Sequence, residues 1–84
     1  MNKLFSDEGW EDLIKWYKID RKIYKRIFQL VDDIERDPFD GIGKPEPLKE
    51  NLSGYWSRRI NEEHRLIYRV TEDSIIIIQC MYHY

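Results

Sequence analysis

The chain has 84 residues, of which 42% are hydrophobic, and a formal net charge of −2 at pH 7. This length predicts one domain, residues 1–84, and leaves no room for a second hydrophobic core. The slight acidic excess excludes a protein that finds nucleic acid through bulk positive charge. Any chemistry on RNA must therefore come from a local cluster of side chains.

The single cysteine, Cys80, excludes an internal disulfide. With only His64 and His83 as further soft ligands, we expect neither a zinc site nor a cofactor. The first ten residues, MNKLFSDEGW, carry acidic groups and no long apolar run, so we expect no signal peptide and no membrane span. The cytoplasm is the expected location.

Two helices are predicted in the first half, after a short apolar piece around Leu4. Ser6 is a suitable N-cap for the first helix, and its apolar face is expected to hold the residues spaced i, i+3, i+4 and i+7, namely Trp10, Leu13, Ile14 and Tyr17. Trp16 falls off this face and is expected to meet another element or a partner.

Asp20 offers a second N-cap, and only Lys18 and Ile19 separate the two helical patterns, which predicts an antiparallel hairpin. The apolar positions of the second helix are Ile23, Ile27, Leu30, Val31 and Ile34. Its opposite face is charged, which indicates either a solvated surface or an RNA contact through Lys22, Lys25 and Arg26. Pro38 is expected to end the helix.

A loop with three prolines and two glycines spans residues 38–47 and fixes the backbone around Glu46, which lies between Pro45 and Pro47. This indicates either a positioned carboxylate or simply the entrance to a strand. Strand signals follow at 48–49, 55–60, 65–70 and 75–84, separated by short turns. Such strands pair as an antiparallel meander. The predicted fold is α+β, with two N-terminal helices on one face of a four- to five-stranded, mostly antiparallel sheet.

Alternation along these strands predicts two faces. The helix-facing set is expected to be Trp56, Ile60, Leu66, Tyr68, Val70, Ile76, Ile78, Cys80 and Tyr82. The opposite set is expected to be Tyr55, Ser57, Arg59, Arg65, Ile67, Arg69, Gln79, Met81 and His83. Arg59, Arg65 and His83 thus share one polar face, while Arg58 falls on the core side and is expected near an edge. Composition and spacing alone support a small α+β domain with a polar concave face.

Longer runs of the sequence carry a more specific signal. The run KPEPLKENLSGYWSRRINEEHRLIY and the terminal MYHY, with the Ser6–Trp10 helix opening and the PFDGIGKPEPLK loop, resemble the YoeB-type branch of the RelE superfamily of bacterial toxins. The resemblance covers essentially the whole chain. It implies a microbial-RNase-like fold, which agrees with the sheet and helices read from the pattern.

The resemblance also implies a function. Such a toxin of a type II toxin–antitoxin system is expected to bind the ribosomal A site and to cleave messenger RNA there without a metal, through attack of the ribose 2′-OH on the adjacent phosphate. By this likeness Glu46 is the general base and His83 the general acid. Arg59 and Arg65 stabilise charge on the phosphate, Lys49 assists, and Tyr84 orients the reactive nucleotide.

The implied partners are a cognate antitoxin of the Phd/YefM type with an acidic tail and the ribosome with its mRNA. Aromatics expected to be exposed, such as Trp16, indicate either an antitoxin interface or a homodimer, and the sequence does not separate the two. The main alternative is a RelE-superfamily toxin that acts by binding, such as a gyrase poison, which is expected to lack the base and acid pair. A degenerate member that only sequesters an antitoxin is a third reading, and no feature of the sequence supports it.

Overall fold

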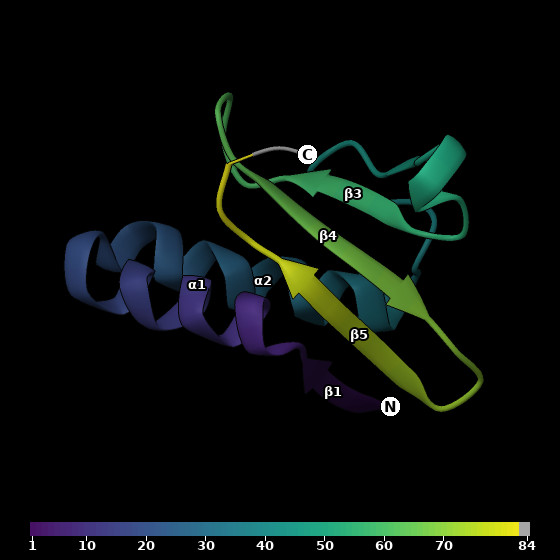
Figure 1. The fold of residues 1–84 in the computed structure, drawn as a ribbon, viewed down its shortest axis with the longest axis horizontal. Coiled ribbons are helices and arrows are strands. Elements are labelled where there is room, and N and C mark those ends of the chain that lie inside the picture. The colour runs from purple at the N-terminus through teal and green to yellow at the C-terminus, as the bar shows by residue number, and fades with distance from the viewer. Residues whose placement is uncertain (83–84) are drawn as a thin grey trace.

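A computed structural model describes residues 1–82. Its single five-stranded sheet has the order β1-β5-β4-β3-β2, and Figure 1 shows the two helices lying behind and beside the strands. The elements are β1 Asn2–Phe5, α1 Asp7–Ile19, α2 Arg21–Arg36, β2 Glu46–Pro47, the 3-10 turn η1 Glu50–Leu52, β3 Trp56–Arg59, β4 Arg65–Val70 and β5 Ser74–Gln79. Strands β2 to β5 form the expected antiparallel meander, and β1 adds a parallel edge beside β5.

Helix α1 begins where the Ser6 hydroxyl accepts the Gly9 N–H at 3.1 Å, as expected for an N-cap. Gly9 lies so close to β5 that a Cβ there would be 2.8 Å from the Ile77 carbonyl oxygen. The helix can approach the strand only because this position is glycine.

That close approach turns α1 so that its buried stripe is Gly9, Asp12, Leu13 and Trp16. The expected face was therefore wrong in part: Trp10, Ile14 and Tyr17 are exposed, and Trp16, at 5% exposure, is buried. Both sets of residues have helical spacing. The more apolar set, which includes Trp10, is not the buried one, because it has no glycine to allow the close approach to β5. The prediction that Trp16 meets another element is confirmed.

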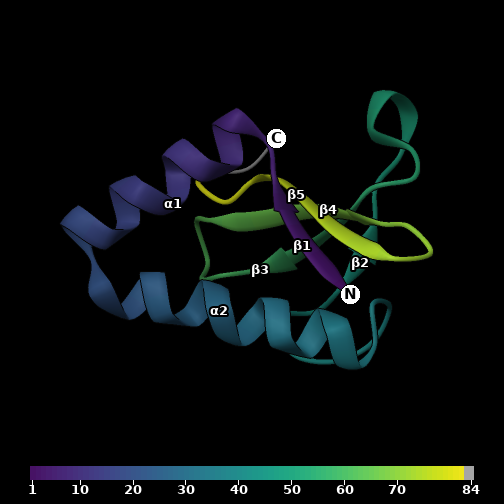
Figure 2. The same ribbon diagram turned by 90° about the horizontal axis from the view of Figure 1, so that it is seen from below.

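Helix α2 follows after one residue, Asp20, whose N–H closes α1 and whose carboxylate caps α2 by accepting the N–H groups of Lys22 and Ile23. Because α1 includes Lys18 and Ile19, the connection is shorter than expected. Figure 2 shows the helices diverging from this junction, with α2 beneath the strands. The expected apolar stripe of α2 is confirmed, since Ile27, Leu30, Val31 and Ile34 are its buried residues.

Strand β5 carries a second correction. Ile75 and Ile77 lie in the core, whereas Ile76 and Ile78 are only half-buried. Tyr68 pairs with Ile77 and Ile67 with Gln79, so Ile78 is an extra residue in the ladder. A bulge reverses the alternation on one side of it, and the face inferred backward from Cys80 was reversed for this reason.

The core lies between the helices and the helix-facing side of β3, β4 and β5. It contains Leu13, Trp16, Ile27, Leu30, Val31, Ile34, Ile60, Leu66, Tyr68, Ile75, Ile77, Cys80 and Met81. Burial raises the pKa of the Cys80 thiol to about 12, so this cysteine stays protonated and unreactive near neutral pH. Neither helix of residues 1–82 is long and apolar enough to cross a membrane.

Candidate active site

The sheet face opposite the helices carries a row of cross-strand partners. Glu46 in β2 is opposite Ser57 in β3, Ser57 is opposite Ile67 in β4, and Ile67 is opposite Gln79 in β5. Glu46 is exposed at one end of this row. Ser57 and Ile67 are buried, at 2% and 1% exposure, although neither belongs to the main core cluster. This face therefore has a covered centre and a polar, accessible edge.

Two residues further along the same strands, Arg59 and Arg65 lie directly opposite each other. Side chains at opposite positions of an antiparallel pair have Cβ atoms about 4.5–5.5 Å apart, and like charges there repel. Within residues 1–82, neither arginine forms an ion pair with a carboxylate. By strand geometry the arginine pair is about 7 Å from the row that holds Glu46. Two cations that no carboxylate in the described part of the chain neutralises, beside Glu46, form a site suited to an anion with a neighbouring proton to remove.

The guanidinium of Arg65 is held in place by the turn before β4. Its Nη1 donates to the carbonyl oxygens of Asn61 at 2.9 Å, Glu62 at 3.1 Å and His64 at 3.2 Å. One nitrogen thus supplies the anchoring, which leaves the rest of the planar fork for a ligand. Arg59, in contrast, is exposed. A fixed guanidinium and an exposed one, from opposed positions of neighbouring strands, can both bind one phosphate.

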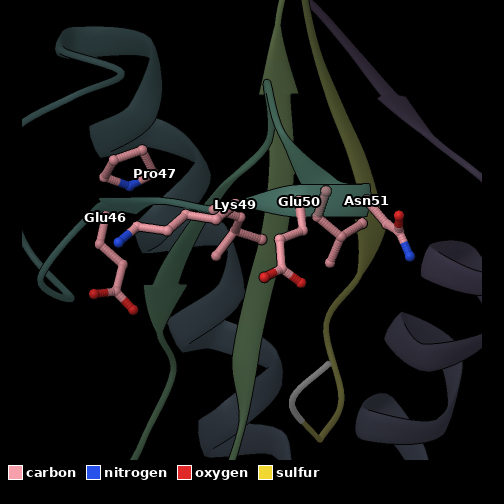
Figure 3. A pocket seen from close by; sticks show the side chains of 7 residues that line it. Glu46, Pro47, Lys49, Glu50 and Asn51 are labelled. Carbon is pink, nitrogen blue, oxygen red and sulfur yellow. The ribbon is translucent and has the colours of Figure 1, made fainter.

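The Lys49 side chain lies on the Glu46 side of the site. A pocket of about 420 Å³ is lined by residues 46–52. Figure 3 shows the Lys49 ammonium reaching toward Glu46, with the carboxylates of Glu46 and Glu50 pointing to the same side. A cation next to the exposed carboxylate can contact a phosphate bound in the pocket.

The loop that delivers Glu46 is fixed from beneath by Arg58. This guanidinium is fully buried and donates to the Asp33 carboxylate, to the carbonyl oxygens of Asp37 and Ile42, and to the Tyr68 hydroxyl. The Tyr68 hydroxyl in turn donates to the Pro38 carbonyl at 2.6 Å. Arg58 lies on the expected core side and, as expected, near an edge of the sheet, because the two-residue edge strand β2 pairs only with Trp56 and Ser57 of β3. The Asp33 carboxylate and the loop carbonyls, and not solvent, thus satisfy the Arg58 guanidinium.

The Asp33 carboxylate completes this network. It accepts hydrogen bonds from Arg36, Arg58 and the Ile42 N–H, and these partners hold its pKa well below the usual range for an aspartate, the Arg36 contact contributing most. The carboxylate is therefore ionised at any physiological pH. Its charge balances the buried guanidinium of Arg58 and keeps the loop before Glu46 in one conformation.

Backbone strain is concentrated next to the candidate site residues. The non-glycine residues of 1–82 with positive φ are Lys44 at 50°, Glu50 at 56° and Tyr82 at 61°. Lys44 is two residues before Glu46, Glu50 follows Lys49, and Tyr82 precedes His83. Left-handed backbone is disfavoured for side-chain-bearing residues and tends to occur at functional sites. This distribution is independent support for the residue set.

Comparisons with known proteins identify the family of this chain. Residues 5–84 match the family model of the YoeB-like toxin of bacterial type II toxin-antitoxin systems. The Toxin YoeB of Streptomyces coelicolor is 57% identical over 84 residues, covering all of both chains. The chain belongs to the YoeB-like toxins.

Two solved structures extend the match to three dimensions. A YoeB dimer from Staphylococcus aureus superposes with a TM-score of 0.94 at 48% identity, covering 100% of this chain and 98% of that one. A heterotetrameric YoeB-YefM toxin-antitoxin complex from the same organism gives 0.93 at 48% identity and the same coverage. The resemblance seen in the sequence and the predicted α+β fold are both confirmed.

The structure describes four of the six residues that the YoeB-type resemblance singled out: Glu46 and Lys49 line one pocket, and Arg59 and Arg65 are cross-strand partners on the same sheet face as Glu46. The other two, His83 and Tyr84, lie outside the described residues, so their roles stay predictions. The described residues end at Tyr82, whose carbonyl oxygen accepts the backbone N–H of Arg65 at 2.8 Å. Within residues 1–82, no group of three or more His, Cys, Asp or Glu side chains could hold a metal ion.

Two features escaped the sequence reasoning. The position of Arg58 was considered, but its hydrogen-bond network was not predicted. The aspartates at 33, 37 and 40, near the start of the loop, were the only hint of acceptors for a buried arginine. His64 was given no role, and it is buried against Trp16, with ring centroids 4.7 Å apart. No spacing rule connects it to its contacts, because they come from distant parts of the chain.

Proposed function

We propose that this toxin is a ribosome-dependent endoribonuclease that cleaves messenger RNA in the ribosomal A site and so stops translation. The observation that carries the proposal is that Arg59 and Arg65 lie opposite each other on the sheet face that also presents Glu46, and that no carboxylate of residues 1–82 pairs with either. A scissile phosphodiester supplies the missing negative charge, and the adjacent ribose hydroxyl supplies a proton for the carboxylate.

The reaction needs a base, an acid and charge stabilisation. Glu46 takes the proton of the 2′-OH, the resulting oxygen attacks phosphorus, and the bond to the 5′-oxygen breaks. His83 donates a proton to that leaving oxygen, so the products are a 2′,3′-cyclic phosphate and a 5′-OH. Arg59, Arg65 and Lys49 stabilise the charge that builds on the phosphate oxygens. Tyr84 orients the reactive nucleotide.

This division of roles is consistent with ordinary acid strengths. A carboxylate with a pKa near 4.3 is ionised at neutral pH and ready to accept a proton, whereas an imidazole near 6.5 needs a neighbouring phosphate to stay protonated. Each proton transfer of this kind contributes about 10²–10⁴-fold to the rate. The net charge of the protein is negative and does not attract RNA. In this proposal the ribosome, in the cytoplasm, therefore delivers the mRNA to the site.

We also propose a cognate antitoxin of the YefM type as the partner that inhibits the toxin. The YoeB of S. aureus has been solved in complex with YefM. An acidic segment that covers the polar face would neutralise Arg59, Arg65 and Lys49 in place of RNA. A second copy of the chain is a further proposed partner, supported by the S. aureus dimer and by the exposed aromatic residues Trp10, Tyr17 and Phe28.

The test uses translating ribosomes programmed with a defined message, with and without the antitoxin-free protein, and maps the new RNA ends. The proposal predicts discrete A-site cuts with cyclic-phosphate and 5′-OH termini, which are absent with His83→Ala and strongly reduced when Tyr84 is deleted. A folded protein that makes no cuts would favour the alternative, a toxin that acts by binding, and gyrase would be assayed next.

A further inference from the structure

The three residues after β5 are held by side chains from elsewhere in the fold. The Cys80 N–H donates to the Asp12 carboxylate at 3.0 Å, and the Cys80 carbonyl accepts the Trp16 indole N–H at 2.7 Å. The Met81 carbonyl accepts the Gln79 amide at 2.9 Å. Asp12 and Trp16 are both buried. Side-chain hydrogen bonds thus hold a segment that lies outside any strand.

Tyr82 is the last residue that the structure describes, and its two backbone groups are both bonded. Its N–H donates to Nδ1 of His64 at 2.7 Å, and its carbonyl accepts the Arg65 N–H at 2.8 Å. Tyr82 has a φ of 61°. Left-handed backbone at a tyrosine persists only where the surroundings impose it, and here the turn is imposed by His64 and the residue that follows it.

The chemistry of His64 suits this contact. It is 8% exposed, with its ring edge-on to Trp16. Because Nδ1 accepts a hydrogen bond, the neutral ring carries its proton on Nε2, which lies 3.5 Å from the Glu63 carboxylate. The ring therefore links α1, the turn before β4 and the chain end. A hydrophobic ring of similar size could fill the space but could not accept the Tyr82 N–H.

We propose that His64 is a positioning residue for the terminal pair His83 and Tyr84: its Nδ1 fixes the Tyr82 backbone in the left-handed turn from which the last two residues continue. This inference rests on the proposed function, in which those two residues act on the RNA. His64 touches no reacting atom in this scheme. It acts only through the backbone of Tyr82.

The experiment compares two substitutions at the same position in the full-length, antitoxin-free chain. His64→Asn places an amide oxygen close to the position of Nδ1, and it can accept the Tyr82 N–H. His64→Phe keeps an aromatic ring against Trp16 and removes the acceptor. Ile34→Val, on the buried face of α2, serves as a control that lowers stability without touching the chain end.

The first readout does not depend on activity. We expect the Tyr82 amide proton to exchange slowly with solvent in the wild type and in His64→Asn, and at least tenfold faster in His64→Phe. The amide signals of residues 83 and 84 should shift in His64→Phe and stay in place in His64→Asn. A Tyr82 amide that exchanges rapidly in the wild type, or terminal signals that are the same in all three proteins, would overturn the inference.

The second readout is cleavage on programmed ribosomes. We expect His64→Phe to lower kcat at least tenfold with KM changed less than threefold, because a misplaced acid slows chemistry more than binding. His64→Asn should recover activity to within threefold, and Ile34→Val should keep it. Equal cleavage by His64→Phe and the wild type would contradict the positioning role. A wild type that cleaves nothing refutes the proposed function, and the amide signals still decide whether His64 positions the chain end.

Discussion

Arg58 and Arg59 are neighbours in β3, yet they serve opposite faces of the sheet. Arg58 points into the core side, is fully buried, and has the Asp33 carboxylate and loop carbonyls as partners. Arg59 points to the other face, is exposed, and lies opposite Arg65. The comparison separates two uses of the same residue type: protein groups satisfy Arg58, which holds the fold, whereas Arg59 is exposed and is one of the residues that we propose bind the phosphate.

The sharpest way to test this contrast is to make the same change at both positions. Arg58→Met removes the countercharge of Asp33 and leaves buried loop carbonyls without donors, so we expect a loss of about 3–5 kcal/mol in the free energy of unfolding. Arg59→Met should change stability by less than about 0.5 kcal/mol. Chemical denaturation measures both. Equal changes in the free energy of unfolding for the two substitutions would contradict the view that only Arg58 holds the fold.

The polar face should show the reverse pattern, with large effects on activity and small ones on stability. Glu46→Gln removes the base while keeping size and shape, and we expect cleavage to fall about 10²-fold or more with an unchanged unfolding midpoint. Glu11→Gln, at an exposed carboxylate on α1, is the matched control and should cleave normally. Full activity of a folded Glu46→Gln protein would exclude Glu46 as the base.

A smaller effect is expected from a change that keeps the charge. Arg65→Lys retains a cation opposite Arg59 but loses the planar fork and the Nη1 bonds to the turn carbonyls. We expect cleavage to fall about tenfold. Binding to vacant ribosomes, measured separately, should stay within a few-fold of wild type. A loss of ribosome binding equal to the loss of cleavage would assign Arg65 to docking and not to chemistry.

The smallest effect concerns acid stability on the core side. The folded-state pKa of Asp33 is depressed, so its contribution is fully present above its unfolded pKa of about 3.9 and is lost as the pH falls below it. Denaturation of wild type and Asp33→Asn between pH 7 and pH 2 should therefore show a stability difference that narrows below about pH 4. A difference that stays constant over this range would show that the ion pair is not coupled to folding.

The fold could be predicted from the sequence where a single local pattern decided it. The stripe of α2, its Asp20 cap and the residues 65–70 of β4 follow from spacing and capping alone. The rotation of α1 could not be read, because it depends on the contact of Gly9 with the Ile77 carbonyl from the other end of the chain. The core-facing residues of β5 could not be predicted, because the strand contains four consecutive isoleucines and no alternation marks the bulge at Ile78.

The candidate site was predicted in part for a similar reason. Arg59 and Arg65 were placed on one face by alternation, and the β3–β4 register adds that they are direct partners. Glu46 and Lys49 were named through the resemblance, and the structure places them beside the pocket at 46–52. The Arg58 and His64 networks join residues many positions apart through hydrogen bonds, and no periodic pattern in the sequence encodes such contacts.

The central claim is that the polar face grips one phosphate between Arg59 and Arg65 with Glu46 at the neighbouring hydroxyl. The most direct measurement is a structure of the Glu46→Gln protein on a ribosome programmed with intact mRNA. The account predicts one A-site phosphate in contact with both guanidinium groups and the adjacent 2′-OH about 2.6–3.2 Å from the side chain of residue 46. An mRNA that passes the protein elsewhere, with this arginine pair facing ribosomal RNA or solvent, would contradict it.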